Sequence, residues 1–160
     1  MNSFTVIFIA TIFVGLALQL WLVSRQAAHI ITHRKAVPPD FADSISLEQH
    51  QKAASYSLAR LALERWDLVL GMVVLLGWTL GGGLAWLDSA IAGAIADPLW
   101  GGVLLVITAV LIGGLIELPL SIWRTFRIEE RFGFNRTTPI GFIKDRLLGV
   151  LLTLILGVPL

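Results

Sequence analysis

Residues 4–23 read FTVIFIATIFVGLALQLWLV, a run without a single charged side chain. At about 1.5 Å of rise per residue, a helix of about 20 residues crosses the hydrocarbon core of a bilayer. No Lys or Arg precedes the run and no small-x-small cleavage site follows it, which disfavours a cleavable signal peptide. The stretch therefore predicts a first membrane span.

Three further apolar segments follow, at residues 68–87, 99–123 and 147–160. The second is uncharged and the third carries one charge, Glu117. The fourth is too short to cross a bilayer. Either the chain ends inside a span, or a helix breaks at Gly157-Val158-Pro159. The expected fold is an all-α multi-pass membrane domain over residues 1–160, with three full spans and a truncated fourth.

The composition agrees with a membrane protein. Hydrophobic residues make up 56% of the chain and charged residues 14%, against about 45–50% and about 25% in soluble domains. The net charge of +1 excludes a diffuse basic surface for nucleic acid. The absence of cysteine excludes disulfides and cysteine-based metal sites or nucleophiles.

Basic residues and tryptophans predict the orientation of the spans. Six of the twelve Lys and Arg residues lie in residues 24–67, the other six lie in residues 124–146, and residues 88–98 have none. The positive-inside rule places both basic loops in the cytoplasm and the N-terminus outside. Acidic residues interspersed in these loops argue against a polybasic lipid-binding patch. Five of the six tryptophans fall at predicted span ends, as expected at a membrane interface: Trp21, Trp66, Trp86, Trp100 and Trp123.

The first cytoplasmic loop contains a helix start. Ser46-Leu47-Glu48-Gln49 has the S-x-x-Q spacing of a capping box, after the break at Pro38-Pro39. We expect one long helix from Leu47 into the second span. Its first part is either an amphipathic lead-in on the membrane surface or a strut that docks a catalytic domain.

Glycines within the spans predict close helix packing. Gly77 and Gly81 form a small-xxx-small pattern that Gly82 and Gly83 extend, and Gly113-Gly114 could oppose it. Packing within the chain is the first interpretation, and homodimerisation is the alternative.

Glu117 and Pro119 mark the cytoplasmic end of the third span. Pro119 predicts a kink, because proline removes a backbone donor. A carboxylate inside a membrane is costly and normally faces a partner or a hydrated cavity. Glu117 is therefore expected either to pair with an arginine of the next loop or to line a polar cavity.

The loop after the third span contains the most distinctive string of the chain, EERFGFNRTTP at residues 129–139. Gly133 permits a turn between two aromatic side chains, Phe132 and Phe134, which can both be buried in one pocket or in the interface. Thr138 and Pro139 have the types of an N-cap and a first helical residue. On these grounds alone the segment is a hinge.

The string resembles the E-R-F-G-F-N segment of the CAAX prenyl protease 1 family of membrane-embedded zinc metallopeptidases. A span ending in Leu-Pro-Leu-Ser at 118–121 and the Gly-Val-Pro-Leu end at 157–160 support the resemblance. The residues that carry it are Glu130, Arg131, Phe132, Gly133, Phe134, Asn135, Thr138, Pro139 and Asp145.

The resemblance implies a multi-helix protease whose helices enclose a hydrated chamber, and Glu117 is the candidate residue of this chain to line it. It also implies a zinc ion held by an H-E-x-x-H helix and a further glutamate, with the motif glutamate as general base. This chain has no H-E-x-x-H. In His29-Ile30-Ile31-Thr32-His33 an isoleucine replaces the base, and His50 is the only other histidine. No catalytic or metal-binding residue is assigned to this chain, which alone should be inactive.

The sequence thus predicts the N-terminal membrane domain of a zinc metalloendopeptidase that cleaves membrane-associated or prenylated proteins. Zinc is expected in the complete protein. The expected partners are the lipid bilayer, a C-terminal catalytic half and protein substrates, without nucleic acid. The alternative is a small non-enzymatic membrane scaffold or partner subunit. Richness in Ala, Leu and Gly favours a bacterial inner membrane over the endoplasmic reticulum.

Overall fold

The computed structural model describes residues 2–95 and 97–157, which form helices and their connections with no strand among them. The predicted all-helical class is confirmed. The chain divides into two compact units. The first comprises Met1–Met72 and Ile122–Asn135, and the second comprises Val73–Ser121 and Arg136–Leu160. Two chain segments build each unit, so residues distant in sequence come together in both.

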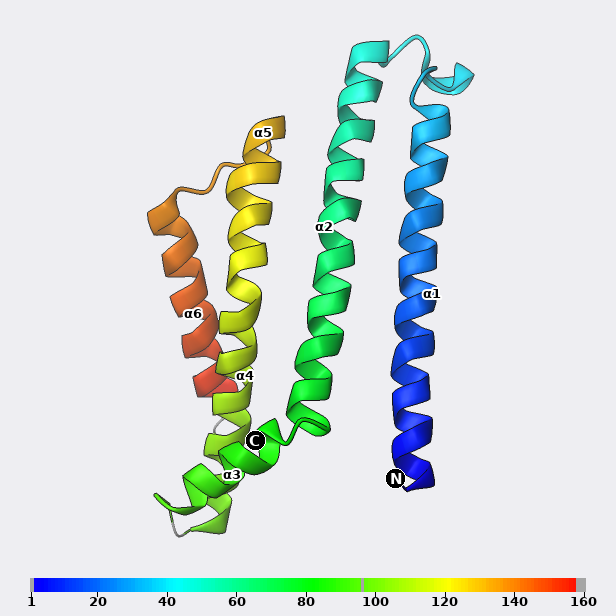
Figure 1. Ribbon diagram of the computed structural model, residues 1–160. Coiled ribbons are helices and arrows are strands. Elements are labelled where there is room, and N and C mark those ends of the chain that lie inside the picture. Colours follow the sequence, from blue (N-terminus) through cyan, green and yellow to red (C-terminus); the bar gives the residue numbers. More distant parts are fainter. Residues whose placement is uncertain (1, 96, 158–160) are drawn as a thin grey trace. The chain divides into compact units, whose positions relative to one another are not determined.

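In the first unit, α1 (Ser3–His33) and the first part of α2 (Leu47–Thr79) lie side by side and antiparallel (Figure 1). A short helix, η1 (Pro39–Phe41), lies in their connection. Val23, Ala27 and Leu61 form the buried core between the two helices. Ile30, Leu58 and Leu68 pack against that core.

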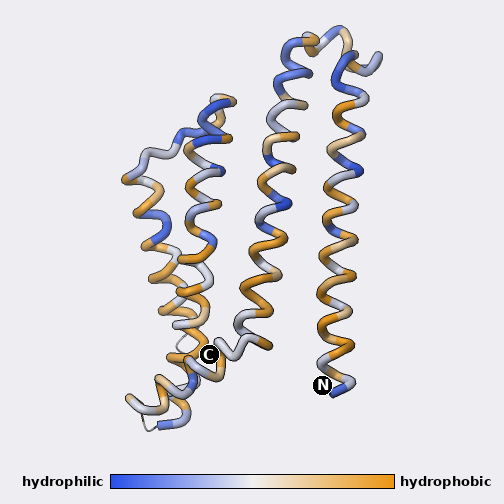
Figure 2. Tube along the Cα trace, viewed as in Figure 1, coloured by the Kyte–Doolittle hydropathy of each residue, from blue (hydrophilic) through white to orange (hydrophobic). Residues whose placement is uncertain are grey.

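The first helix is longer than the predicted span. It continues ten residues beyond residue 23 to His33, because no glycine or proline interrupts residues 24–33. Residues 24–33, which the sequence assigned to the first cytoplasmic connection, thus continue the helix of the first span. Figure 2 shows that the hydrophilic residues of α1 and α2 gather towards the ends that the connection joins.

The capping box at the start of α2 is confirmed. The Ser46 backbone N–H donates to Gln49 Oε1 at 3.0 Å, and the Gln49 N–H donates to Ser46 Oγ at 3.2 Å. These reciprocal bonds satisfy two backbone donors that a helix start would otherwise leave unpaired. The helix then runs without interruption to Thr79, as the sequence predicted.

The second predicted span, residues 68–87, is not one straight helix. α2 ends at Thr79 and α3 (Gly83–Ala92) begins after a left-handed Gly82 with φ +76°. The two helices are bent by 50°. Residues 88–92, expected in a turn, belong to α3. Among the described residues, two helical stretches are long and apolar enough to cross a membrane, Ser3–His33 and Pro98–Phe132, or three if the bent pair counts as one span.

The glycines predicted to pack helices together instead close this bend. A Cβ on Gly81 would lie 2.7 Å from the Gly77 carbonyl oxygen, and one on Gly83 would lie 2.9 Å from that same atom. A Cβ on Gly113 or Gly114 would meet nothing within 4 Å. The close approach is therefore between the two sides of one bend, and the predicted contact with Gly113-Gly114 was wrong.

The second unit also contains α4 (Pro98–Trp123), up to Ser121, and α6 (Pro139–Gly157), which lie side by side in Figure 1. Asp97 Oδ1 caps α4 by accepting from the Leu99 and Trp100 N–H groups at 2.9 and 3.2 Å. The Arg146 guanidinium donates to Ser121 Oγ and ties α6 to α4. α4 continues through Pro119 to Trp123, and the departure from α-helical geometry falls later, at Arg124–Glu129.

The last helix starts earlier than the predicted truncated span. α6 begins at Pro139, eight residues before residue 147, and includes Lys144, Asp145 and Arg146. The last three residues of the Gly-Val-Pro-Leu end, 158–160, lie outside the described residues.

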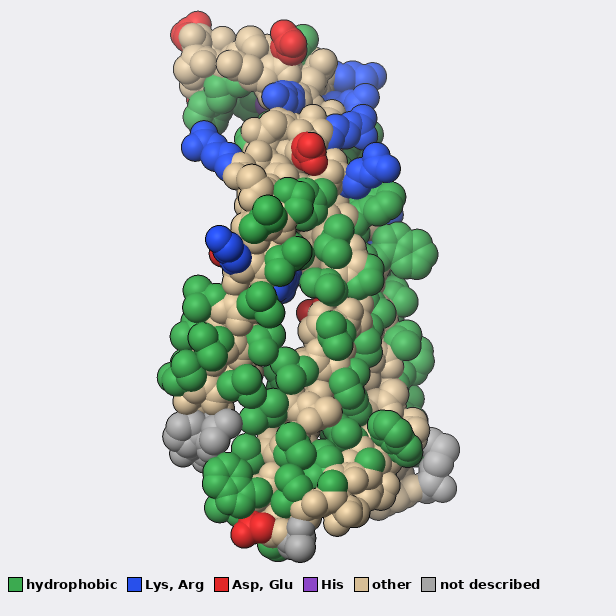
Figure 3. Space-filling model, turned by 90° about the vertical axis from the view of Figure 1, so that its left-hand side faces the viewer, with side chains coloured by type: hydrophobic (Ala, Val, Ile, Leu, Met, Phe, Trp, Pro, Cys, Tyr) green, Lys and Arg blue, Asp and Glu red, His purple; other side chains and the backbone are tan. Residues whose placement is uncertain are grey.

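Large apolar side chains are exposed on α1, α2, α4 and α6, and Figure 3 shows hydrophobic side chains over much of one face. The five tryptophans predicted at span ends are all more than half exposed: Trp21, Trp66, Trp86, Trp100 and Trp123. A surface of this kind is suited to lipid contact.

Candidate functional site: the helix end that carries the motif

The third predicted span is followed directly by a π-helix. After α4, residues Arg124–Glu129 adopt π-helical geometry and α5 (Glu130–Phe132) completes the helix. A π-helix places about one more residue in a turn than an α-helix, and such segments are frequent at functional sites. Glu130, Arg131 and Phe132 are therefore helical, and the first four residues of the predicted hinge at 129–139 belong to the helix end.

An ion pair joins this helix end to α2 within the first unit. The Arg124 guanidinium donates to the Asp67 carboxylate, and the two side chains are 46% and 31% exposed. Sequence reasoning missed this pair because both residues lie just outside predicted spans. A signal was present, since Trp66-Asp67 and Trp123-Arg124 place opposite charges after two interfacial tryptophans.

Gly133 ends the helix, as predicted. Its φ of +78° and ψ of 20° are left-handed, a conformation that glycine adopts without a steric cost. Its N–H donates to the Glu130 carbonyl at 3.0 Å, and the Phe134 N–H donates to the Glu129 carbonyl at 2.8 Å. These two bonds are those of a Schellman motif, a common way to satisfy the last carbonyls of a helix. The E-R-F-G-F-N string is thus, in physical terms, a helix end and its cap.

The two motif phenylalanines contact one tyrosine of α2. The Tyr56 ring centroid lies 5.4 Å from that of Phe132, edge on, and 4.7 Å from that of Phe134. Phe132 is buried, but Phe134 is 56% exposed. Burial in one protein pocket is therefore confirmed for Phe132 only, and the alternative of burial in the membrane interface stays a prediction for Phe134. Tyr56 was not predicted, although it is the only tyrosine of the chain.

The remaining motif residues belong to the second unit. Thr138 caps α6, since its Oγ1 accepts from the Gly141 N–H at 3.0 Å, and Pro139 is the first helical residue. Both predictions are confirmed. Asp145 is exposed on α6. Within the first unit the structure therefore brings Phe132 and Phe134 against α2, whereas Thr138, Pro139 and Asp145 belong to the second unit.

Glu117 lies on α4 in the second unit, where it is exposed. Within the described part of the chain its carboxylate forms no hydrogen bond or ion pair. Within its own unit it does not pair with Arg136 or Arg146, and the pairing with another arginine of the next loop stays a prediction.

The described residues do not form a site that fits zinc. No group of three or more His, Cys, Asp or Glu side chains among them could hold a metal ion. The His29 and His33 rings lie 4.1 Å apart, but His33 Nδ1 lies 2.8 Å from the His29 carbonyl oxygen. His50 Nε2 lies 3.2 Å from the His33 carbonyl oxygen. Backbone oxygens thus occupy one nitrogen of both His33 and His50.

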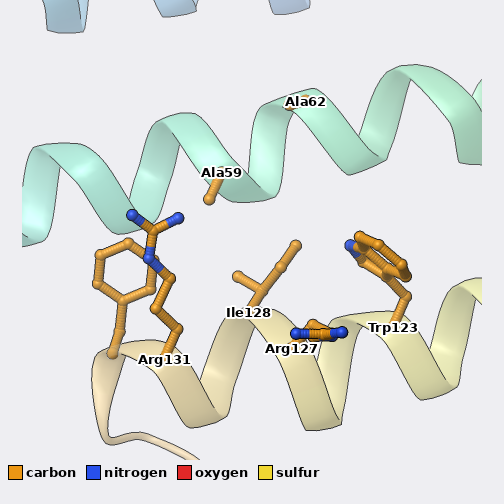
Figure 4. A pocket seen from close by; sticks show the side chains of 7 residues that line it. Ala59, Ala62, Trp123, Arg127, Ile128 and Arg131 are labelled. Atoms are coloured by element: carbon orange, nitrogen blue, oxygen red, sulfur yellow. The ribbon is translucent and has the colours of Figure 1, made fainter.

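A cavity of about 610 Å³ lies between α2 and the π-helical segment (Figure 4). Ala59 and Ala62 line it on α2. Trp123, Arg127, Ile128, Arg131 and Phe132 line it on the other side. The site thus combines a built helix cap, an ion pair and an open cavity that contains two arginines.

Comparisons with known proteins agree with the family resemblance of the sequence. The chain is similar to CAAX prenyl protease 1 homologues of Oryza sativa subsp. japonica, at 44% identity over 46 residues, and of Taenia solium, at 50% over 44 residues. These matches cover 29% and 28% of this chain, and 11% and 9% of the relatives. Only a small part of those relatives is therefore matched.

The fold is similar to the crystal structure of S. mikatae Ste24p, with a TM-score of 0.88 and 22% sequence identity. That comparison covers 99% of this chain and 38% of Ste24p. The family model described as CAAX prenyl protease N-terminal, five membrane helices, matches residues 26–160. Because this match includes most of the chain, the protein belongs to the CAAX prenyl protease N-terminal family.

Proposed function

We propose that the chain is the N-terminal membrane part of a zinc metalloendopeptidase similar to CAAX prenyl protease 1, which cleaves membrane-associated or prenylated proteins. The family match over residues 26–160 is the observation that carries the proposal. Because no H-E-x-x-H occurs in this chain, zinc and the catalytic groups are assigned to a C-terminal half of the complete protein.

In this proposal the chain contributes two things to the protease. The capped helix end from Glu130 to Asn135, which packs against α2, provides a surface on which the catalytic half rests. The spans form part of the wall of a hydrated chamber, with Glu117 facing its interior. The exposed carboxylate of Glu117, without a partner in the described residues, supports this role, because an isolated acid in a membrane helix normally faces water.

The first test is the reading frame beyond Leu160. We expect it to encode H-E-x-x-H, and we expect the purified complete protein to hold one zinc ion per chain and to cleave a farnesylated CAAX peptide. Replacement of the motif glutamate by glutamine should abolish cleavage while zinc is retained. A long extension without H-E-x-x-H, or a stop codon after Leu160, would contradict the protease assignment.

A non-enzymatic scaffold or partner subunit is the second candidate, and the absence of catalytic groups in this chain favours it. The two functions differ in one measurement. A scaffold would co-purify with a separate subunit and would show no cleavage by itself, whereas the protease is active as one polypeptide.

The proposed orientation has the N-terminus outside and both basic loops in the cytoplasm of a bacterial cell, at its inner membrane. The chain has no cysteine, so single substitutions report accessibility without interference from other cysteines of this chain. We expect Ser89→Cys to react with a membrane-impermeant maleimide in intact cells, and Ser44→Cys to react only after lysis. The reverse pattern would overturn the orientation, and a signal from the endoplasmic reticulum in a native eukaryotic host would overturn the location.

A further inference from the structure

The cavity between α2 and the π-helical segment contains two arginines that the motif does not explain. Arg127 and Arg131 are four residues apart, and Figure 4 shows the Arg131 guanidinium extending towards α2 near Ala59. In the described residues neither guanidinium forms a hydrogen bond or an ion pair, in contrast to Arg124. Arg127 lies 5.8 Å from the Trp123 ring centroid, and Arg131 lies 5.6 Å from that of Phe132.

Both arginines are exposed and have no hydrogen-bond or ion-pair partner among the described residues, so their charge and their N–H donors are open to a ligand. Like charges one helical turn apart repel each other. The dipole at the carboxyl end of a helix stabilises the positive charge of both arginines. It does not supply hydrogen-bond acceptors for their N–H groups. Each guanidinium has five N–H donors in a planar fork that matches the oxygens of a phosphate. An anion between the two side chains would remove the repulsion and use these donors.

The remaining walls indicate which anion fits. Ala59, Ala62 and Ile128 are apolar, and Trp123 is the last residue of the apolar helix α4. Tryptophan at the end of an apolar helix is typical of the headgroup level of a bilayer. A ligand for this cavity therefore needs a negative charge beside arginines and an apolar part beside alanines and isoleucine.

We propose that the cavity binds one anionic phospholipid, with Arg127 and Arg131 donating to its phosphate oxygens and Trp123, Ile128 and Ala62 contacting its glycerol and upper acyl carbons. Basic pockets between membrane helices bind anionic headgroups in this way. The site is a defined pocket with two arginines, and differs from the diffuse polybasic patch that the interspersed acids argue against.

The test uses the complete protein in detergent micelles, with bound lipid counted by native mass spectrometry during titration with phosphatidylglycerol or phosphatidylcholine. We expect one phosphatidylglycerol to be retained in preference to phosphatidylcholine. The double variant Arg127→Gln, Arg131→Gln should bind it about tenfold more weakly, because each 1.4 kcal/mol of lost charge-assisted bonding is about tenfold. The matched control, Arg34→Gln with Arg136→Gln, removes the same charge outside the cavity and should bind as the wild type does.

A second variant tests the cavity without changing the charge. Ala62→Leu narrows the cavity, keeps both arginines and should also lose the lipid, which decides the question if the double variant does not fold. Equal binding of both lipids, or an equal loss in the control, would overturn the proposal. Displacement of the lipid by equimolar inorganic phosphate would also overturn it, since free phosphate would then be the ligand. Absence of any bound lipid would overturn the proposal as well.

Discussion

The Arg124 guanidinium, at the start of the π-helical segment, donates to the Asp67 carboxylate of α2. This bond and the contacts of Tyr56 with Phe132 and Phe134 attach the helix end to α2 at two positions along α2, Asp67 and Tyr56. The ion pair lies near Trp66 and Trp123 in sequence, and the aromatic contact lies at the helix cap.

Loss of the ion pair should destabilise the protein modestly. Because both side chains are partly exposed, we expect Asp67→Asn or Arg124→Gln to lower the free energy of unfolding by about 1 kcal/mol or less. A double-mutant cycle in detergent micelles measures the coupling. The exchange Asp67→Arg with Arg124→Asp should recover part of the loss, and full additivity of the two single changes would show that the residues do not interact.

Substitution of Gly133 should act through the backbone conformation. A Cβ at this position would meet nothing within 4 Å, so the strain at that atom comes from the left-handed φ. We expect Gly133→Val to cost about 1–2 kcal/mol of unfolding free energy and to impair cleavage by the complete enzyme. Gly133→Asn is the matched control and should cost less, because asparagine tolerates this conformation. Equal stability of the valine and asparagine variants would contradict the role given to the turn.

Tyr56 should matter for its ring and not for its hydroxyl. Tyr56→Ala removes two aromatic contacts, each worth about 0.5–1.5 kcal/mol, and should lower the unfolding free energy by about 1–3 kcal/mol. Tyr56→Phe keeps the ring and should be nearly neutral. Thermal unfolding of both variants, followed by circular dichroism, is the measurement. A large loss in Tyr56→Phe would point to a hydrogen bond of the hydroxyl instead.

Two glycines of the second predicted span should respond in opposite ways to alanine. Gly82→Ala introduces a side chain at φ +76° and should destabilise the bend by about 1 kcal/mol. Gly71→Ala lies inside α2 with open space around its Cβ and should stabilise the helix by about 0.5–1 kcal/mol. The melting temperature should therefore fall below that of the wild type for Gly82→Ala and rise above it for Gly71→Ala. A change of the same sign in both variants would contradict the bend at Gly82.

Glu117→Gln should lower the activity of the complete enzyme without lowering its unfolding free energy. The carboxylate has no partner among the described residues, so we expect its loss to leave the unfolding free energy unchanged or raised. If Glu117 lines the chamber, kcat/KM for a farnesylated peptide should fall about tenfold. Thr108→Ala, on the same helix, is the control and should leave kcat/KM unchanged. An unchanged kcat/KM in the Glu117→Gln enzyme would show that Glu117 does not act in the chamber wall.

Local signals predicted the helix starts and the cap well. Ser46 and Gln49, Thr138 and Pro139, and Gly133 each act through hydrogen bonds or dihedral angles that a few neighbouring residues determine. Helix ends without such a signal were predicted poorly. Hydropathy placed the end of α1 at residue 23, but helical geometry continues through polar residues until a breaker occurs.

Contacts between distant residues were beyond the sequence. Asp67 and Arg124 are 57 positions apart, and neither belongs to the recognised string. The glycine bend after Thr79 was also missed, because four glycines in seven positions satisfy the pattern for close helix packing as well as the pattern for a turn. Which role they have depends on the backbone dihedral of Gly82, which spacing does not reveal.

The π-helical segment determines which way the side chains of the following helix end, Glu130 to Phe132, point around the helix axis. One residue corresponds to about 100° around an α-helix. If Arg124–Glu129 relaxed to α-helical geometry, Arg131 and Phe132 would turn by about that angle relative to Arg124, and the phenylalanine would leave Tyr56 while the ion pair stayed. The E-R-F-G-F-N string therefore faces α2 because of the six residues before it, which are not part of the string.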